Sequence, residues 1–302
     1  MSLFEMDHWR CAIVHAPFEE VIKRNTLEGY GITWLPDYGK RHFFADPFGI
    51  WHDGRLYVFV ESYDYHPGKG KIDVLVYDEA FSLIEHETVL QEPWHLSYPQ
   101  IIRHGDEFYL LPEGYKSGRL SLYRAVKFPY QWERVTAFDF PIGAIDATPL
   151  FYRDRWWLFW TPPTPKSYRQ SALHIALAEE LTGAWCDMGC VLVDREGARP
   201  GGTACVVNDD VILPVQDCSS SYGGGMQTLR ISGLGYGKPR IETRGHFPLP
   251  KTLAGSHSDG MHTLSAAGSV TLVDFKKINY GIAHKIPLIR DLILNDRKLR
   301  QS

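Results

Sequence analysis

A two-strand unit that recurs along the chain constrains the fold more than any other feature of the sequence. Its first copy runs from Phe44 to Glu61: an apolar and aromatic stretch, the turn Asp53-Gly54, and a second stretch of strand-forming residues. Asp-Gly is a strong hairpin signal, because glycine accepts the positive φ that a tight turn needs. A hairpin brings its outer ends together, so Asp46 and Glu61 are expected at the same end of a sheet.

Further segments repeat this layout about every 50 residues, which is within the period range of propeller blades. The copies are 98–113, 146–161, 201–217 and, more weakly, 259–274. A third strand follows most of these hairpins. The repeat predicts an all-β fold, a five-bladed β-propeller, with blades beginning near residues 45, 98, 146, 201 and 259. The alternative is an irregular β-sandwich in which the hairpins recur by coincidence.

The two ends of the chain differ from the repeat. Residues 9–15 read as a strand outside the blades, and we expect this strand to pair with the fifth blade, because closing the ring removes exposed edges. Residues from about 287 to 300 are apolar at helical intervals and basic at their end, which predicts a short C-terminal amphipathic helix. Such a helix can pack on its own domain, contact a partner protein or lie on a membrane surface. We expect residues 1–302 to form one domain.

Composition excludes several classes of function. A net charge of −4 argues against an electrostatic nucleic-acid binder. The N-terminus lacks the pattern of a signal peptide, and five cysteines, an odd number, do not suggest a disulfide framework. We therefore expect a cytoplasmic protein with reduced thiols, although a chain that has lost a leader would look the same. Cys186 and Cys190 lack further zinc ligands nearby. No cofactor or catalytic metal is predicted, and a structural ion in the central channel stays open.

In a propeller, the starts of the first strands and the ends of the second strands meet at one face. Carboxylates, imidazoles and aromatic rings gathered there suit a sugar, and a pair of carboxyl groups can act as general acid and base on a glycosidic bond. Crowding of like charges raises the pKa of one partner, as a general acid requires. The candidate catalytic residues are Asp46, Glu113, Asp146 and Asp217, and the candidate substrate-binding residues are His95, Tyr98, Arg199, His257, Asp259 and His262. For each carboxylate, capping of a turn is the structural alternative.

Several motifs resemble those of one family. They are Glu92–Pro99, Leu111–Gly114, Leu122–Ala125, Phe128-Pro129, Ala198–Gly202, Gln216–Cys218 and Tyr222-Gly223. In combination they resemble the N-terminal domain of glucosamine inositolphosphorylceramide transferase and its bacterial relatives, over most of residues 40 to 265. The resemblance implies a five-bladed propeller related in fold to arabinanases, xylosidases and invertase-like enzymes. It also implies that the protein handles a glycan.

The resemblance to those glycosidases can be followed residue by residue. Asp46, in an Ala-Asp-Pro setting, matches their general base, and Asp146 matches their second aspartate, which tunes the acid and orients the substrate. Their general-acid glutamate lies at the start of a later blade, where this chain has Arg199-Pro-Gly-Gly. An enzyme of this type would need Glu113 or Asp217 as its acid.

Three functions therefore remain open. The first is a carbohydrate-active enzyme, either a glycosidase or a glycosyl-transfer catalyst. The second is a non-catalytic module that binds a glycan, a glycoconjugate or a sugar nucleotide in polysaccharide or glycolipid biosynthesis. The missing glutamate at Arg199 and the basic tail favour this second function. The third is a scaffold that uses its rim to contact protein partners.

Overall fold

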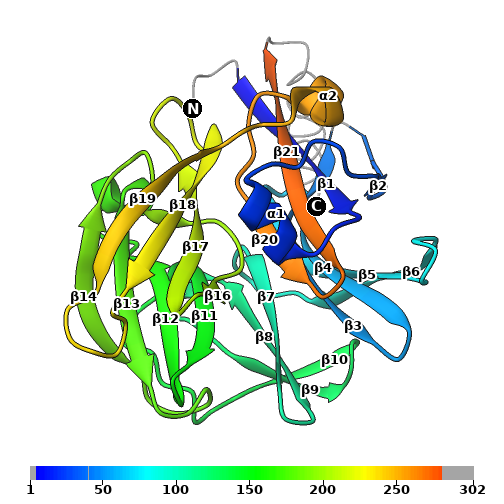
Figure 1. Ribbon diagram of the computed structural model, residues 1–302. Coiled ribbons are helices and arrows are strands. Elements are labelled where there is room, and N and C mark those ends of the chain that lie inside the picture. The colour runs from blue at the N-terminus through cyan, green and yellow to red at the C-terminus, as the bar shows by residue number, and fades with distance from the viewer. Residues whose placement is uncertain (1–4, 40, 281–302) are drawn as a thin grey trace, which may run out of the picture.

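The computed structural model describes residues 5–39 and 41–280. These residues form five antiparallel sheets that follow one another around a common centre, so the five-bladed propeller is confirmed (Figure 1). The C-terminal helix predicted for residues 287–300 lies outside the described residues.

The first three blades each contain four strands, from the centre outwards in chain order. Blade one consists of β3 (His42–His52), β4 (Arg55–Asp64), β5 (Lys69–Tyr77) and β6 (Leu83–Leu90). Blade two consists of β7 (Ser97–His104), β8 (Glu107–Glu113), β9 (Tyr123–Lys127) and β10 (Gln131–Arg134). Blade three consists of β11 (Ile145–Tyr152), β12 (Arg155–Thr161), β13 (Ala172–Ala178) and β14 (Cys186–Val193).

The last two blades depart from this plan. In blade four the innermost strand is broken into two short pieces that both pair with the next strand. Its elements are β15 (Arg199–Pro200), β16 (Cys205–Val207), β17 (Asp210–Asp217), β18 (Gly225–Ser232) and β19 (Arg240–Phe247). Blade five joins the two ends of the chain: β20 (Leu264–Ala267), β21 (Val270–Tyr280), β1 (Glu5–Val14) and β2 (Ile32–Trp34).

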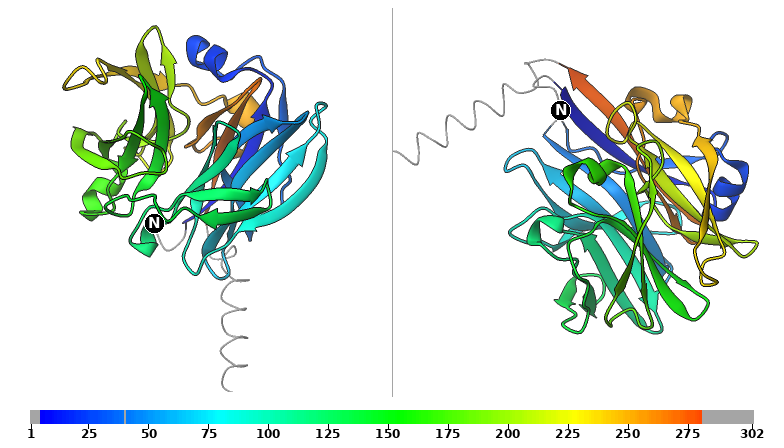
Figure 2. Two further views of the ribbon diagram at one scale, coloured as in Figure 1. Left: turned by 90° about the horizontal axis from the view of Figure 1, so that it is seen from below. Right: turned by 90° about the vertical axis from the view of Figure 1, so that its left-hand side faces the viewer.

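The ring closes through the pairing of β1 with β21. The register runs from Glu5 opposite Tyr280 to Val14 opposite Thr271. In Figure 1 the blue β1 lies beside the orange-red β21, and both views in Figure 2 show the same neighbours. The first and last long strands of the described chain therefore pair within one sheet, blade five. This pairing closes the ring.

In the part of the chain that the structure describes, the helices are few and short. The longest, α1 (Phe18–Arg24), buries three apolar side chains between blades four and five, in a stretch for which the sequence predicted no element. The others are α2 (Lys251–Ala254) and the 3₁₀ turns η1 (Tyr115–Ser117), η2 (Lys166–Gln170) and η3 (Gly255–His257). Within the described ranges, no helix is apolar and long enough to cross a bilayer.

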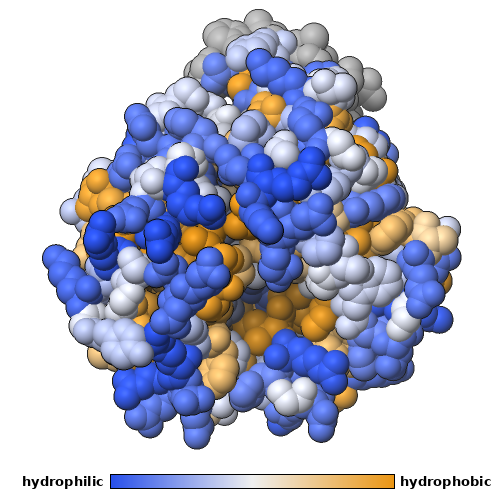
Figure 3. Space-filling model, in the orientation of Figure 1, coloured by the Kyte–Doolittle hydropathy of each residue, from blue (hydrophilic) through white to orange (hydrophobic). Residues whose placement is uncertain are grey.

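The hydrophobic core is divided among the contacts between blades. Each neighbouring pair of blades encloses its own cluster, such as that of Trp157 and Phe159 in blade three with Leu213 in blade four. Hydrophilic side chains cover most of the face shown in Figure 3, where apolar ones show mainly in hollows. A further cluster joins Trp9 of blade five to Phe43 and Ala45 of blade one and packs against Tyr63, Tyr65 and Tyr222. This aromatic cluster marks the site described next.

Candidate functional site

Three of the blades interrupt their innermost strand with the same bulge. The pairing register shifts at Asp46, Tyr98 and Asp146, and the φ angles of these residues are 49°, 47° and 48°. Positive φ is uncommon for residues other than glycine, and bulges often lie next to active sites, where they redirect side chains. The bulges explain why these residues recur at matching positions of the repeat.

Each bulge directs a backbone N–H group to a carboxylate of the preceding blade. The amide of Asp46 donates to Asp274 Oδ2 (3.0 Å), and the amide of Tyr98 donates to Asp46 Oδ2 (3.1 Å). The amide of Asp146 donates to Glu113 Oε2 (3.3 Å). Hydrogen bonds to charged groups are stronger than neutral ones, and they satisfy carboxylates that would otherwise be costly to bury. These carboxylates therefore join neighbouring blades.

His262 lies between two of these carboxylates. Its Nδ1 is 2.7 Å from Asp274 Oδ2, and its Nε2 is 3.6 Å from Asp46 Oδ1. Burial alone would lower the pKa of His262, but Asp274 and Asp46 outweigh it and raise the pKa above 6.5. The pKa of Asp46 is raised to about 6, mainly by burial, against the opposing effect of His262. The ring of Trp9 stacks on His262 with centroids 3.7 Å apart.

These residues also form the one candidate metal set among the described residues. One ligand atom each from Asp46, His262 and Asp274 lies within 4.8 Å of the others. The carboxylate oxygens are already hydrogen-bonded, since Thr263 Oγ1 donates to Asp46 Oδ1 and the amides of His262 and Thr263 donate to Asp274 Oδ1. A cation here would have to compete with these protein donors.

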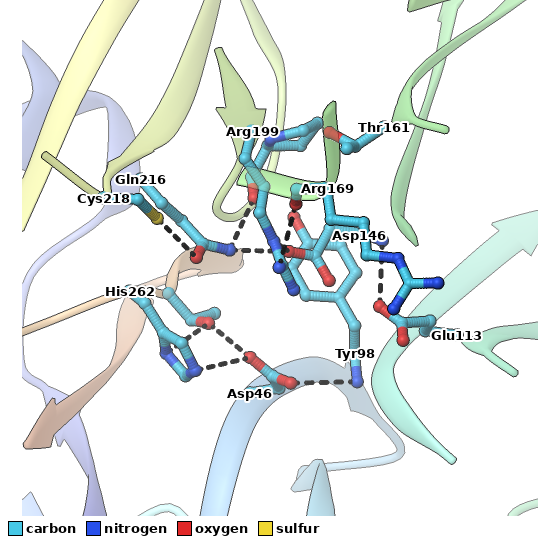
Figure 4. A network of polar contacts seen from close by, with 12 residues as sticks. Asp46, Tyr98, Glu113, Asp146, Thr161, Arg169, Arg199, Gln216, Cys218 and His262 are labelled. Atoms are coloured by element: carbon cyan, nitrogen blue, oxygen red, sulfur yellow. Dashed lines mark hydrogen bonds and ion pairs between the residues drawn. The ribbon is translucent and has the colours of Figure 1, made fainter. Parts of the chain in front are cut away.

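Arg199 lies in β15, the first short piece of the innermost strand of blade four. Its Nε donates to Asp146 Oδ2 at 2.6 Å, and Gln216 Nε2 donates to the same oxygen at 2.6 Å (Figure 4). The side chains of Arg199 and Asp146 are 11% and 3% exposed, so they form a buried ion pair. The guanidinium group also lies 5.0 Å from the ring of Tyr222. Asp146 is thus engaged by a cation rather than by a second carboxyl group.

A cavity of about 640 Å³ lies beside Arg199 and His262. Its polar lining includes Glu61, Glu113, His95, Arg199 and His262, and its apolar lining includes Trp9, Phe43, Tyr63, Tyr65 and Tyr222. Burial raises the pKa of both glutamates well above 4.5, and the neighbouring acids add to the effect. Aromatic faces and carboxyl groups with raised pKa values therefore line the same cavity.

His95 has a defined protonation state in this cavity. The amide of Gly70 donates to His95 Nδ1 at 2.9 Å, so Nδ1 is an acceptor. Burial, with a smaller effect of Lys116, lowers the pKa of His95 to about 4. The neutral ring must then carry its proton on Nε2, which lies 3.6 Å from Glu61 Oε1. His95 is a neutral donor that faces Glu61.

Tyr98, expected to bind substrate, lies in the centre of the ring and does not line the cavity. Its side chain is fully buried. Its hydroxyl group lies 2.9 Å from Thr148 Oγ1 in blade three and accepts a 2.6 Å bond from the amide of Gly202 in blade four. In this structure Tyr98 joins three blades at the centre.

Three other expected site residues lie away from the cavity lining. Asp217 accepts hydrogen bonds from the amide and hydroxyl groups of Ser219, so it caps a turn. Strand β17 instead directs the preceding residue, Gln216, into the site, where its register partner is Arg199. The side chain of Asp259 accepts a bond from the amide of Ile278.

His257, the third of these residues, packs against another histidine. Its Nε2 lies 3.3 Å from Nδ1 of His8, and the side chain is buried. Burial, with a smaller effect of His8, lowers the pKa of His257 to about 4. His257 therefore belongs to a contact between η3 and β1. Of the ten candidates, the structure brings Asp46, Glu113, Asp146, His95, Arg199 and His262 together.

Sequence reasoning missed most of the aromatic wall. Trp9 comes from the closing strand β1, and Phe43 from the start of β3. Tyr63 and Tyr65 follow Glu61 directly, and this turn-rich aromatic segment was a detectable signal. Tyr222 belongs to a Ser- and Gly-rich loop, in which a Cβ on Gly223 would lie 2.6 Å from Trp9 and 3.0 Å from His262. The glycine lets this loop pack closely over the cavity wall.

Solved structures with a similar fold include glycosidases. The catalytic domain of a Coprinopsis cinerea GH62 α-L-arabinofuranosidase has a TM-score of 0.57 at 10% identity and covers 80% of this chain and 93% of its own. A GH43 β-xylosidase/α-arabinofuranosidase from a compost microbial metagenome has a TM-score of 0.56 at 12% identity. The match covers 82% of this chain and 95% of that enzyme's chain. At such low identity the comparison shows the shared fold alone.

The sequence comparisons are more specific. Glucosamine inositolphosphorylceramide transferase 1 of Oryza sativa subsp. indica is 34% identical over 206 residues, which are 64% of this chain and 27% of that protein. The Arabidopsis thaliana protein of the same name is 27% identical over 262 residues, which are 82% of this chain and 34% of that protein. The chain thus spans about a third or less of these relatives. Residues 37–243 match the family described as glucosamine inositolphosphorylceramide transferase 1, N-terminal, and the chain therefore belongs to that family.

Proposed function

We propose that the cavity binds a sugar unit of a glycan or glycoconjugate. One observation carries this proposal: a wall of five aromatic side chains and two buried carboxyl groups, Glu61 and Glu113, line one cavity of about 640 Å³. Small-molecule sites combine apolar walls with a few well-placed polar groups. The apolar face of a sugar ring packs on aromatic rings, and its hydroxyl groups bond to carboxyl and imidazole groups.

The polar groups offer both donors and acceptors to sugar hydroxyl groups. Burial raises the pKa values of Glu61 and Glu113 well above 4.5, which favours the protonated carboxyl group, a group that can donate as well as accept. Neutral His95 presents its Nε2 proton, and Arg199 lines the same cavity. The relatives are named glucosamine inositolphosphorylceramide transferase 1, and the sugar in that name agrees with a glycan as the ligand.

Binding without hydrolysis is the form of this function that the site supports best. A glycosidase of related fold needs a carboxylic acid where this chain has Arg199, and Arg199 is held by Asp146 at 2.6 Å. Asp46 does not line the cavity, and its two oxygens accept hydrogen bonds from Tyr98 and Thr263. Asp46 and Asp146 are therefore already hydrogen-bonded to groups of the protein.

A glycan array followed by calorimetric titration tests the proposal. Tyr63 is a partly buried wall residue that stacks on Phe43 with centroids 4.9 Å apart, and Tyr236 is 77% exposed outside the cavity. We expect Tyr63→Leu to weaken binding of the array ligand about tenfold, a loss of ~1.4 kcal/mol, while Tyr236→Leu leaves it unchanged. Absence of any glycan ligand, or equal effects of the two variants, would refute the proposal.

Acid–base catalysis is a second candidate, favoured by the raised pKa values. Glu113 would donate a proton to the leaving-group oxygen, and Asp46, with a pKa of about 6, would act as the base. Release of reducing ends from the array ligand, lost in both Glu113→Gln and Asp46→Asn while both variants stay folded, would establish it. Full turnover in Asp46→Asn, or binding without any turnover, would remove this candidate.

A further inference from the structure

A second cavity, of about 360 Å³, adjoins the first. The two cavities share Glu113, Tyr115, Gln170 and Arg199, so one ligand can extend from one into the other. The second cavity is built by the loop after blade three's second strand, which contains η2, and by the segment that leads into blade four. None of the residues predicted from the sequence drew attention to it, apart from the shared Glu113 and Arg199.

The lining of this second cavity is strongly cationic. It contains four basic side chains: Lys166, Arg169, Arg195 and Arg199. Its one acidic lining residue is Glu113, and burial raises the pKa of this carboxyl group well above 4.5, which disfavours its charged form. Asp146 neutralises Arg199 through their ion pair, but no carboxylate in residues 5–39 and 41–280 forms an ion pair with the other three. Three basic side chains without an ion-pair partner among the described residues therefore line the cavity.

Arg169 is held in place by the protein before any ligand arrives. Its Nε donates to the carbonyl oxygen of Pro163 at 2.7 Å, and its Nη1 donates to the hydroxyl of Tyr115 at 3.4 Å. The guanidinium carbon also lies 5.1 Å from the centre of the Tyr115 ring. A guanidinium has five N–H donors, so two used here leave about three for a ligand. A fixed guanidinium with free donors is suited to bind a phosphoryl group.

We propose that this second cavity is a subsite for a phosphoryl group, so that the ligand is a sugar phosphomonoester. The sugar lies in the first cavity against the aromatic wall, and the phosphoryl oxygens lie between Lys166, Arg169 and Arg195. This inference rests on the proposed function for the position of the sugar, but the anion subsite itself does not depend on it. A doubly charged phosphoryl group matches the surplus of cations better than a single carboxylate does.

Calorimetric titration with four probes tests the subsite: inorganic phosphate, glucose 1-phosphate, methyl glucoside and glucuronate. The test variant is Arg169→Gln. The control is Arg155→Gln, an exposed arginine at the hairpin end of blade three, away from both cavities. We expect inorganic phosphate to bind the wild type and the control equally, and Arg169→Gln to bind it about tenfold more weakly. Added salt should weaken phosphate binding to the wild type.

The probes separate failure of the subsite from failure of the sugar site. No binding of inorganic phosphate, or equal phosphate affinity in the Arg169 and Arg155 variants, overturns the subsite whatever the sugars do. Tighter binding of glucuronate than of glucose 1-phosphate overturns the phosphoryl assignment. Binding of methyl glucoside without any gain from the phosphate refutes the subsite and leaves the proposed function standing. Phosphate binding that needs Arg169, with no sugar binding on the array, supports the subsite and removes the sugar site.

Discussion

The buried pair of Arg199 and Asp146 offers the sharpest test of how the site is held together. Replacing Arg199 by Met leaves the Asp146 carboxylate buried, at 3% exposure, with Gln216 as its remaining side-chain donor. Breaking a buried ion pair from one side costs about 3–5 kcal/mol. Because Gln216 stays in place, we expect the lower end, about 3 kcal/mol of unfolding free energy, or roughly 6 °C or more in Tm.

A double-mutant cycle isolates the interaction. Asp146→Asn is compatible with the backbone, since Asn tolerates the φ of 48° found there and its amide oxygen can still accept from Gln216. The single variant Asp146→Asn leaves the cation of Arg199 buried, whereas the double variant leaves neither charge. We expect the double variant to be more stable than the sum of the single effects predicts, by about 2 kcal/mol.

Urea denaturation followed by tryptophan fluorescence measures these energies. Arg230 provides the matched control, because it lies in the same blade and its Nη2 is 2.5 Å from Asp210, but it is 50% exposed. Arg230→Met should cost no more than about 1 kcal/mol. A loss below about 1 kcal/mol in Arg199→Met, or strict additivity in the cycle, would refute the reasoning.

Three further variants test separate features of the ring. Folding raises the pKa of Glu113 above its unfolded value of about 4.5. The protonated Glu113 side chain therefore contributes fully to stability below about pH 4.5, and this contribution is lost as the pH rises towards the pKa of the folded state. Glu113→Gln should therefore gain stability relative to the wild type above pH 4.5, by up to ~1.4 kcal/mol per pH unit in urea denaturation; a constant difference would contradict this. Gly202→Ala should give no folded protein in a solubility assay, because its Cβ would lie 1.8 Å from the Leu264 carbonyl oxygen. The control variant Gly189→Ala, whose Cβ would meet no atom within 4 Å, should stay soluble. Tyr98→Phe should lose about 1–3 kcal/mol of unfolding free energy, because the Gly202 amide loses its acceptor, yet it should bind the array ligand normally; weakened binding would restore Tyr98 as a ligand contact.

The order of blades could be predicted because it depends on neighbouring residues. At the first hairpin, Asp53 and Gly54 have φ angles of 48° and 71°, the paired positive values that an Asp-Gly turn supplies. Alternating apolar residues on either side then form the two strands. The same local signals recur in the other blades, so the number of blades followed from counting them.

The content of the site was harder to predict, because strand parity and loop packing are not local properties. Asp217 and Gln216 are adjacent, and side chains alternate between the two faces of a strand. An error of one residue therefore replaces Gln216, which donates to Asp146, with Asp217, which caps a turn. Trp9 was expected to lie in a closing strand, and nothing in the segment 9–15 shows that its ring would stack on His262. The basic lining of the second cavity comes from two separate segments that meet only in the folded chain.

By itself, the sequence determined a closed ring of hairpins with acids near their inner ends, since each hairpin depends on turn residues and strand formers a few positions apart. Only the tertiary structure decided which acids meet, what they bond and which rings cover them. Asp46 and Asp274 are 228 positions apart, yet a backbone amide of one donates to the carboxylate of the other once β1 and β21 have closed the ring. This contact can form only when all the blades between the two residues are folded. Each blade is rotated relative to the one before it, and these rotations add up around the central axis until the ring closes.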